Sequence, residues 1–216
     1  MCKIGSKRKI LSQLNALARQ HVNVEICILA GGLSRRIGRD KSRLRFGQTT
    51  MLGHIRKTAH ATDLPVRVIR RDCVPKCGPV GGIYTALKST KADAVLFLAC
   101  DMPLVSTELL HFVLRQFDNP GGKTKTVIHN AVFVRSRGAG FPLILRREAL
   151  EQVEQQIEKG DFSLQSLAKV VKATMLRLTS DWSQQLFNVN TPGEWTAMHT
   201  RHFQGGSIRE MQAAKT

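Results

Sequence analysis

The chain has 216 residues, of which 42% are hydrophobic and 23% charged, and its formal net charge is +17 at pH 7. This composition is ordinary for a globular protein with one sizeable core. No apolar run approaches the roughly 20 residues of a membrane span, and the basic N-terminus lacks the continuous apolar core of a signal peptide. These features argue against a membrane protein and predict a cytoplasmic one.

The strong positive charge raises the local concentration of polyanions and speeds their capture, but it does not say which polyanion is bound. The five cysteines do not indicate a metal centre. Cys27 and Cys100 fall in expected buried strands, where they are most simply small core residues. Cys73 and Cys77 are separated by three residues, but no second Cys or His pair at ligand spacing accompanies them. A loop with two thiols is therefore the better interpretation.

The pattern of apolar residues and breakers predicts alternating strands and helices. We expect a basic N-terminal extension over 1–22 with an amphipathic helix at 6–20, a domain over 23–200, and a mobile tail over 201–216. Strands are predicted at 24–30, 66–69, 93–100, 125–134, 173–178 and 185–189. Helices are predicted at 48–60, 83–88, after Ser106 or Thr107, at 146–158 and 164–171, and from Gly193. Loops are predicted at 70–77 and 135–143.

A glycine turn follows the first buried strand. Gly31 and Gly32 allow a sharp turn and a close approach to a ligand, and Ser34 adds a hydroxyl donor. A dense run of cations follows, namely Arg35, Arg36, Arg39, Lys41, Arg43 and Arg45. A glycine turn followed by guanidinium and ammonium groups is what polyphosphate binding requires. The spacing is neither the dinucleotide fingerprint nor the P-loop.

Residues 29–44 resemble the L-A-G-G-x-S-x-R-M-G-x-D-K-x-x-L motif of nucleotidyltransferases related to molybdenum cofactor guanylyltransferase. Every position matches except Ile37, which replaces methionine. Three further motifs of that family occur. Asp72, Pro75, Gly78, Pro79 and Gly82 match D-x-x-P-x-x-G-P-L-x-G; Cys100, Asp101 and Pro103 match C-D-x-P; residues 188–192 match N-x-N-T-P. The resemblance extends over about 26–198.

The resemblance implies a three-layer α/β/α, Rossmann-like nucleotidyltransferase fold with a mostly parallel sheet. It implies that GMP is transferred from GTP to Mo-molybdopterin with release of pyrophosphate, with Mg2+ as cofactor. Molybdoenzymes or other proteins of cofactor biosynthesis are the implied partners. Gly31 favours the guanylyl branch, because related cytidylyltransferases show L-A-A-G at this point. A cytidylyltransferase or another nucleotidyltransferase of the same fold is the alternative.

Site residues are carried over from the matched positions. Arg36, Lys41 and Asp101 are the catalytic candidates, and Asp101 is also the metal ligand, since it follows a buried strand where open α/β sheets bind ligands. Asn188 and Asn190 belong to the acceptor side. The nucleotide-binding candidates are Leu29, Ala30, Gly31, Gly32, Ser34, Lys41, Asp72, Gly78, Pro79 and Asp101.

One departure from the family concerns the segment before Asp72. The family has an additional strand and helix there, and this chain is too short at that point to hold both, so part of the base-recognition wall is expected to be absent. Arg70 and Arg71 flank Asp72 and either compensate for that loss or are ordinary surface arginines, the simpler interpretation.

A nucleic-acid-binding protein is the hypothesis from another class, motivated by the charge of +17. The chain has no helix-turn-helix, zinc-finger or aromatic stacking motif, with one Tyr and two Trp. Four matched motifs outweigh charge alone, so nucleic acid is not the expected partner.

Overall fold

A mixed β-sheet organises the chain in the computed structural model, which describes residues 22–31, 44–118, 130–135, 138–191, 193–196 and 198. Within these residues the sheet has six strands in the order β4-β1-β5-β7-β6-β8. The strands are β1 (Val24–Leu29), β4 (Val66–Ile69), β5 (Ala94–Ala99), β6 (Ala131–Arg135), β7 (Ala139–Arg146) and β8 (Thr174–Arg177). β1 pairs in parallel with β4 and β5, β6 pairs in parallel with β8, and only β7 runs antiparallel to its neighbours.

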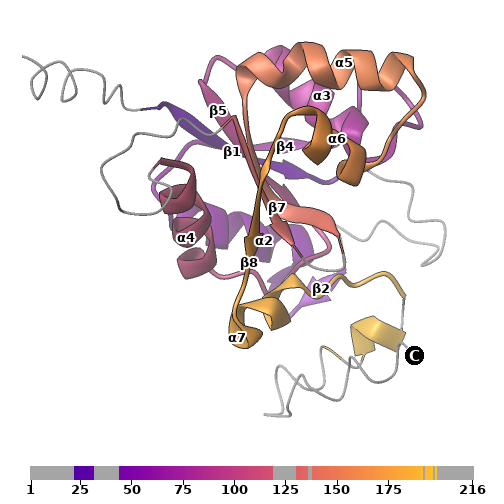
Figure 1. Cartoon of the computed structure of the whole chain (residues 1–216). Coiled ribbons are helices and arrows are strands. Elements are labelled where there is room, and N and C mark those ends of the chain that lie inside the picture. The colour runs from indigo at the N-terminus through magenta and orange to yellow at the C-terminus, as the bar shows by residue number, and fades with distance from the viewer. Residues whose placement is uncertain are drawn as a thin grey trace, which may run out of the picture.

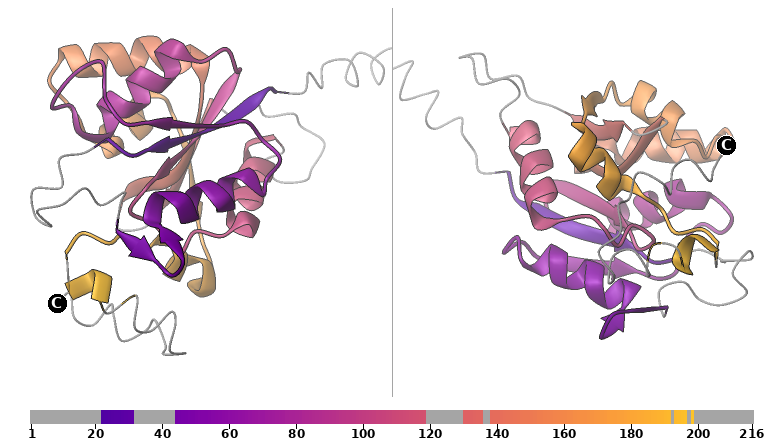
Figure 2. Two further views of the ribbon diagram at one scale, coloured as in Figure 1. Left: turned by 180° about the vertical axis from the view of Figure 1, so that it is seen from behind. Right: turned by 90° about the horizontal axis from the view of Figure 1, so that it is seen from below.

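Helices cover both faces of this sheet, which gives the predicted three-layer α/β/α architecture (Figure 1). One face packs against α2 (Met51–His60) and α4 (Thr107–Asp118), and the other against α3 (Gly78–Ser89), α5 (Leu150–Glu158) and α6 (Leu164–Val170). Figure 2 shows the sheet and the helices on its two faces from behind and from below. The short elements are β2 (Arg45–Phe46), β3 (Thr49–Thr50), η2 (Arg147–Ala149), α7 (Ser180–Ser183) and η3 (Gln184–Leu186). Among the described helices, none has the length and apolar character needed to cross a membrane.

Alternation along the strands divides the core into two layers. In β1, Ile26 and Ile28 face α2 and α4, whereas Cys27 faces α3. In β5, Leu96 lies in the first layer and Phe97 in the second. Cys27 is fully buried, and this burial raises the pKa of its thiol to about 12, so the prediction of a structural cysteine is confirmed.

The predicted helix starts are confirmed where a side chain caps the helix. Thr50 Oγ1 accepts a hydrogen bond from Gly53 N at 3.0 Å at the start of α2. Ser106 Oγ accepts from Leu109 N before α4, and Ser163 Oγ accepts from Gln165 N and Ser166 N before α6. These bonds satisfy backbone donors that the first helical turn leaves without partners.

Two predicted segments are wrong. Residues 139–143, predicted as part of the loop at 135–143, belong to strand β7. The apolar residues Leu143 and Leu145 pair with β5, and a register shift in the β6–β7 ladder passes over Pro142, which has no backbone donor. Residues 185–189 form no strand: their first residues belong to η3, and Phe187 and Val189 pack on Phe46 instead of extending the sheet.

Smaller differences concern element bounds. α3 begins at Gly78 and not at Ile83, with Pro79 in the first turn, where its missing N–H costs nothing. The helix predicted at 146–158 begins with η2 before α5. Three predicted parts lie outside the described residues: the helix at 6–20, residues 125–129 of the strand predicted over 125–134, and the tail over 201–216.

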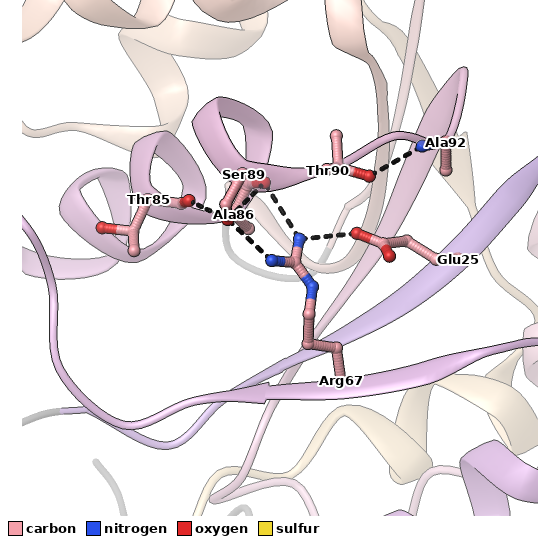
Figure 3. Close-up of polar contacts among 7 residues, drawn as sticks. All are labelled: Glu25, Arg67, Thr85, Ala86, Ser89, Thr90 and Ala92. Carbon is pink, nitrogen blue, oxygen red and sulfur yellow. Dashed lines mark hydrogen bonds and ion pairs between the residues drawn. The ribbon is translucent and has the colours of Figure 1, made fainter.

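Edge strand β4 is fastened to the rest of the fold by Arg67 (Figure 3). Its Nη2 lies 2.6 Å from Glu25 Oε1 on β1 and 2.9 Å from the carbonyl oxygen of Ala86 on α3. Its Nη1 donates to Ser89 Oγ at 2.7 Å. Both charged side chains are largely removed from water, so this fork is more than a surface ion pair. The Arg67 side chain therefore links β4 both to the neighbouring strand β1 and to helix α3, which packs on one face of the sheet.

Candidate functional site

The carboxyl ends of three parallel strands meet at one edge of the sheet. Leu29 of β1 stands in register with Ile69 of β4 and with Ala99 of β5. The ladder continues for one more residue on each side: Ala30 N donates to Ile69 O at 2.8 Å, and Cys100 N donates to Leu29 O at 3.2 Å. The residues that follow these strands therefore emerge together, which is where open α/β sheets bind ligands.

Gly31 is the first of these residues, and the space around it admits only glycine. A Cβ at Gly31 would lie 2.9 Å from the carbonyl oxygen of Arg70 and 3.5 Å from Asp72 Oδ1. The glycine turn thus passes directly against the segment that follows β4. The other predicted residues of this motif, Gly32, Ser34, Arg36 and Lys41, lie outside the described residues.

The Asp72 carboxylate lies among three glycines. A Cβ at Gly82 would lie 3.3 Å from Oδ1, and a Cβ at Gly81 would lie 3.3 Å from Oδ2. Gly31 forms the third side. Burial raises the pKa of the Asp72 carboxyl above its ordinary value. The chain thus brings a half-buried carboxylate to the end of β4 and packs three glycines closely against it.

Gly78 and Pro79, which were predicted to bind the nucleotide, are exposed in the first turn of α3. Nothing lies within 4 Å of the Cβ position at Gly78, so Gly81 and Gly82 are the α3 glycines that lie against Asp72. Neither Gly81 nor Gly82 was predicted as a site residue, although Gly82 is one of the matched motif positions. The G-P-x-x-G pattern pointed to this turn, but not to which glycines face the carboxylate.

Thr85 is a second residue that the sequence did not reveal. Its Oγ1 accepts from Cys73 N at 2.9 Å and donates to Gly81 O at 2.8 Å. It therefore fastens the loop after Asp72 to α3. Cys73 and Cys77 are free thiols in this loop, and no group of three or more metal-ligating side chains is found among the residues that the structure describes. Cys73 lies between β4 and α3 and Cys77 directly precedes α3, so the predicted loop carries both thiols.

Asp101 follows β5 at the same edge. It is half-buried, with Oδ1 removed from solvent. Its carbonyl oxygen accepts a hydrogen bond from Val189 N at 2.8 Å. This bond brings together two motifs that are 88 positions apart, since Val189 stands between Asn188 and Asn190. The predicted metal-binding residue and the predicted acceptor side are therefore neighbours.

The segment beyond Val189 is held by a reciprocal cap. Glu194 Oε2 accepts from Asn190 N at 2.7 Å and from Thr191 N at 3.1 Å, while Thr191 Oγ1 accepts from Glu194 N at 3.1 Å. This is a capping box: the hydroxyl of the first residue accepts from the backbone N–H of the glutamate, and the carboxylate of the glutamate accepts from the backbone N–H of the first residue. Val189 itself is buried with Phe46 and Met51. The backbone around Asn188 and Asn190 is therefore held at two points, by the bond from Val189 N to Asp101 O and by the bond from Asn190 N to Glu194 Oε2.

These features define an α/β protein in which two carboxylates, Asp72 and Asp101, follow parallel strands at the same edge of the sheet. The family described as "MobA-like NTP transferase domain" matches residues 26–71 and 56–178, which together span more than half of the chain. The chain belongs to this family and is a nucleotidyltransferase.

Relatives and solved structures agree with this assignment. A molybdenum cofactor guanylyltransferase of Acinetobacter baumannii is 33% identical over 173 residues, covering 69% of this chain and 78% of the relative. An Aquifex aeolicus protein named "Probable molybdenum cofactor guanylyltransferase" is 28% identical over 179 residues, covering 76% and 84%. The molybdopterin-guanine dinucleotide biosynthesis protein A of Archaeoglobus fulgidus has the same fold, with a TM-score of 0.65 at 16% identity, covering 83% and 99%.

Proposed function

We propose that the protein transfers GMP from GTP to Mo-molybdopterin, forming molybdopterin guanine dinucleotide and releasing pyrophosphate. The observation that carries this proposal is the hydrogen bond from Val189 N to Asp101 O, which places the N-x-N-T-P motif beside the C-D-x-P motif at the ligand-binding edge. The two named relatives, which align over most of this chain, support the choice of substrates.

In this reaction a phosphate oxygen of the acceptor attacks the α-phosphorus of GTP. The bond between the α-phosphorus and the bridging oxygen breaks, and pyrophosphate leaves with that electron pair. The attacking oxygen is already anionic, so the site needs no strong general base. Its task is to hold both substrates in line and to neutralise the charge that develops on the transferred phosphate.

The matched residues divide this task. We assign Gly31, Gly32 and Ser34 to binding the phosphates, and Arg36 and Lys41 to supplying cations to them. Asn188 and Asn190 bind the acceptor next to Asp101. The remaining nucleotide contacts are Leu29, Ala30, Asp72, Gly78 and Pro79.

Asp101 fits the kind of magnesium site in which the substrate phosphates supply ligands beside a protein carboxylate. Mg2+ is commonly bound by one or two carboxylates together with substrate phosphates rather than by a cage of protein ligands. Asp101 is such a carboxylate, half-buried after β5 with Oδ1 removed from solvent. When bound, the ion would neutralise charge on the phosphates.

Equilibrium binding of GTP, CTP, ATP and UTP in the presence of magnesium tests the nucleotide, and pyrophosphate release with Mo-molybdopterin tests the transfer. We expect GTP to bind most tightly and pyrophosphate to appear only when the acceptor is present. Preferential binding of CTP would favour the cytidylyl alternative. Failure to bind any of the four nucleotides would contradict the proposed reaction.

A further inference from the structure

Two free thiols lie on the short loop between β4 and α3. Cys73 directly follows Asp72 and is exposed, whereas Cys77 is buried at the last position before α3. The other described cysteines, Cys27 in β1 and Cys100 after β5, come from separate strands. An exposed thiol that has a second, less accessible thiol close to it on the same loop is the arrangement of an attacking and a resolving cysteine.

The chain turns back between the two thiols. Pro75 and Lys76 are the central residues of this turn, and Lys76 has a φ of +66°, as a type II turn requires at its third residue. Such a turn brings its first and fourth residues, here Val74 and Cys77, within about 7 Å of each other. The thiol of Cys77 is directed back into the loop, because its Sγ lies 3.4 Å from the carbonyl oxygen of Pro75. The two sulfurs can therefore meet by a rearrangement confined to this loop.

Both thiols pack on the same part of α3. Cys73 Sγ lies 3.3 Å from Thr85 Oγ1, which donates to Gly81 O at 2.8 Å. Cys77 Cβ lies 3.1 Å from the Cβ position of Gly81. The pKa of the Cys77 thiol is raised by burial and by the nearby charges of Asp72 and Cys73. Cys77 therefore stays protonated at neutral pH, and the exposed Cys73 is the thiol that reacts first.

We propose that Cys73 and Cys77 are a thiol–disulfide site that reacts with small-molecule disulfides such as oxidised glutathione. The Cys73 thiolate attacks one sulfur of the oxidant, whose sulfur–sulfur bond breaks, and one glutathione leaves as a thiolate. Cys77 then loses its proton and attacks Cys73 Sγ, and the second glutathione leaves. Two cysteine thiols are thus oxidised to one disulfide and one oxidised glutathione is reduced to two thiols, which take up the two cysteine protons through solvent.

The bond changes the surroundings of Asp72, and its effect on the nucleotide rests on the proposed function. The carboxylate and Cys77 lie against the same residue, since the Cβ position of Gly81 is 3.3 Å from Asp72 Oδ2. When the sulfur of Cys73 leaves Thr85 for Cys77, the bond from Cys73 N to Thr85 Oγ1 at 2.9 Å no longer holds the segment after Asp72. The oxidised protein should bind GTP about fivefold more weakly, the scale of one hydrogen bond.

The test is incubation of the whole protein with defined ratios of oxidised to reduced glutathione, followed by alkylation of free thiols and digestion with trypsin. Trypsin cuts after Lys76, between the two cysteines, so the disulfide joins peptide 72–76 to peptide 77–88. We expect mass spectrometry to show this linked pair as the ratio rises and to show its loss on reduction. Cys27 is the internal control, because it is fully buried and should stay reduced while the protein is folded.

Two single substitutions separate the roles of the thiols. Cys77→Ser should stop at the mixed disulfide, with one glutathione on Cys73. Cys73→Ser should gain no glutathione, because the remaining thiol of the loop is buried. Cys100→Ser is the matched control and should form the linked peptides as the wild type does. Melting curves establish that each variant is folded.

Absence of the linked peptides at every ratio, or a bond from Cys73 to another cysteine, would overturn the proposal. A linked pair with unchanged affinity for GTP would overturn the coupling of the bond to Asp72. If the reduced protein binds no nucleotide, the proposed function fails, while the linked peptides still decide whether the two thiols form the site.

Discussion

The two ends of the site are built differently. At the end of β5, Asp101 is joined by a backbone hydrogen bond to Val189, and a capping box fixes the residues beyond it. At the end of β4, the half-buried Asp72 carboxylate lies among glycines, followed by a loop and preceded by two exposed arginines. In the proposed reaction, the reacting end therefore has a backbone fixed by hydrogen bonds, whereas the nucleoside end is bounded by glycines and a loop.

The largest effect is expected at the reacting end. Asp101→Asn keeps the shape of the side chain but removes the charge that, in the proposed reaction, would hold magnesium against the phosphates. Loss of several kcal/mol of transition-state stabilisation would lower turnover by orders of magnitude, since each ~1.4 kcal/mol is tenfold in rate. Pyrophosphate release measures turnover, and a melting curve should show little loss of stability. Near-normal turnover in the folded variant would remove Asp101 from the site.

The next effect concerns Gly31, which lies between the two ends. In Gly31→Ala the new Cβ would lie 2.9 Å from the backbone oxygen of Arg70, so the turn must move, at a cost of about 1–3 kcal/mol. Gly82→Ala is the comparison, because its Cβ meets the flexible end of Leu29 at 3.0 Å. GTP binding should fall more in the first variant than in the second. The opposite order would contradict the close packing of the turn against Arg70.

A third substitution weakens only the β4 end. Arg67→Met keeps the apolar stem but removes the bonds to Glu25, Ala86 and Ser89, and should lower the free energy of unfolding by about 1–3 kcal/mol. Urea denaturation measures this loss, with Arg147→Met as the control at an exposed position. A variant as stable as the wild type would show that the fork does not fasten β4.

The smallest effect is expected at Asp72. Because burial raises the pKa of this carboxyl in the folded protein, the folded state holds the proton more tightly than the unfolded state. Stability contributed by this group is present at low pH and is lost as pH rises through the raised pKa. Asp72→Asn should therefore melt slightly higher than the wild type at pH 7 and equally at a pH where both states are protonated, while binding GTP less well. A lower melting temperature at pH 7 would contradict this.

The sequence predicted those parts of the fold in which local pattern and tertiary packing agree. β1 and β5 are apolar on both faces, and Thr50 and Ser163 cap helices in the ordinary way. β7 was missed because Gly140 and Pro142 are typical of loops, and only its position between β5 and β6 makes it a strand. Phe187 and Val189 were wrongly assigned to a strand because they are apolar. They pack in a separate small cluster with Phe46 and Met51 and not in the sheet.

The sequence predicted which residues belong to the candidate site, but it did not predict how these residues are arranged in space. The motifs pointed to Asp72, Asp101 and the two asparagines. No local pattern could show that Val189 bonds to Asp101, because that contact depends on the path of the whole chain between them. The glycines around Asp72 likewise became distinguishable only once α3 was seen to begin at Gly78.

The edge position of β4 also bears on self-association. A strand at the border of a sheet exposes backbone groups to which another chain can add, and natural sheets counter this with short strands and inward-pointing charges. β4 has four residues, and its one charge, Arg67, is directed into the fold toward Glu25 and α3. The same guanidinium that anchors the strand therefore discourages strand addition, and a neutral residue in its place would make the protein more prone to form β-linked aggregates at high concentration.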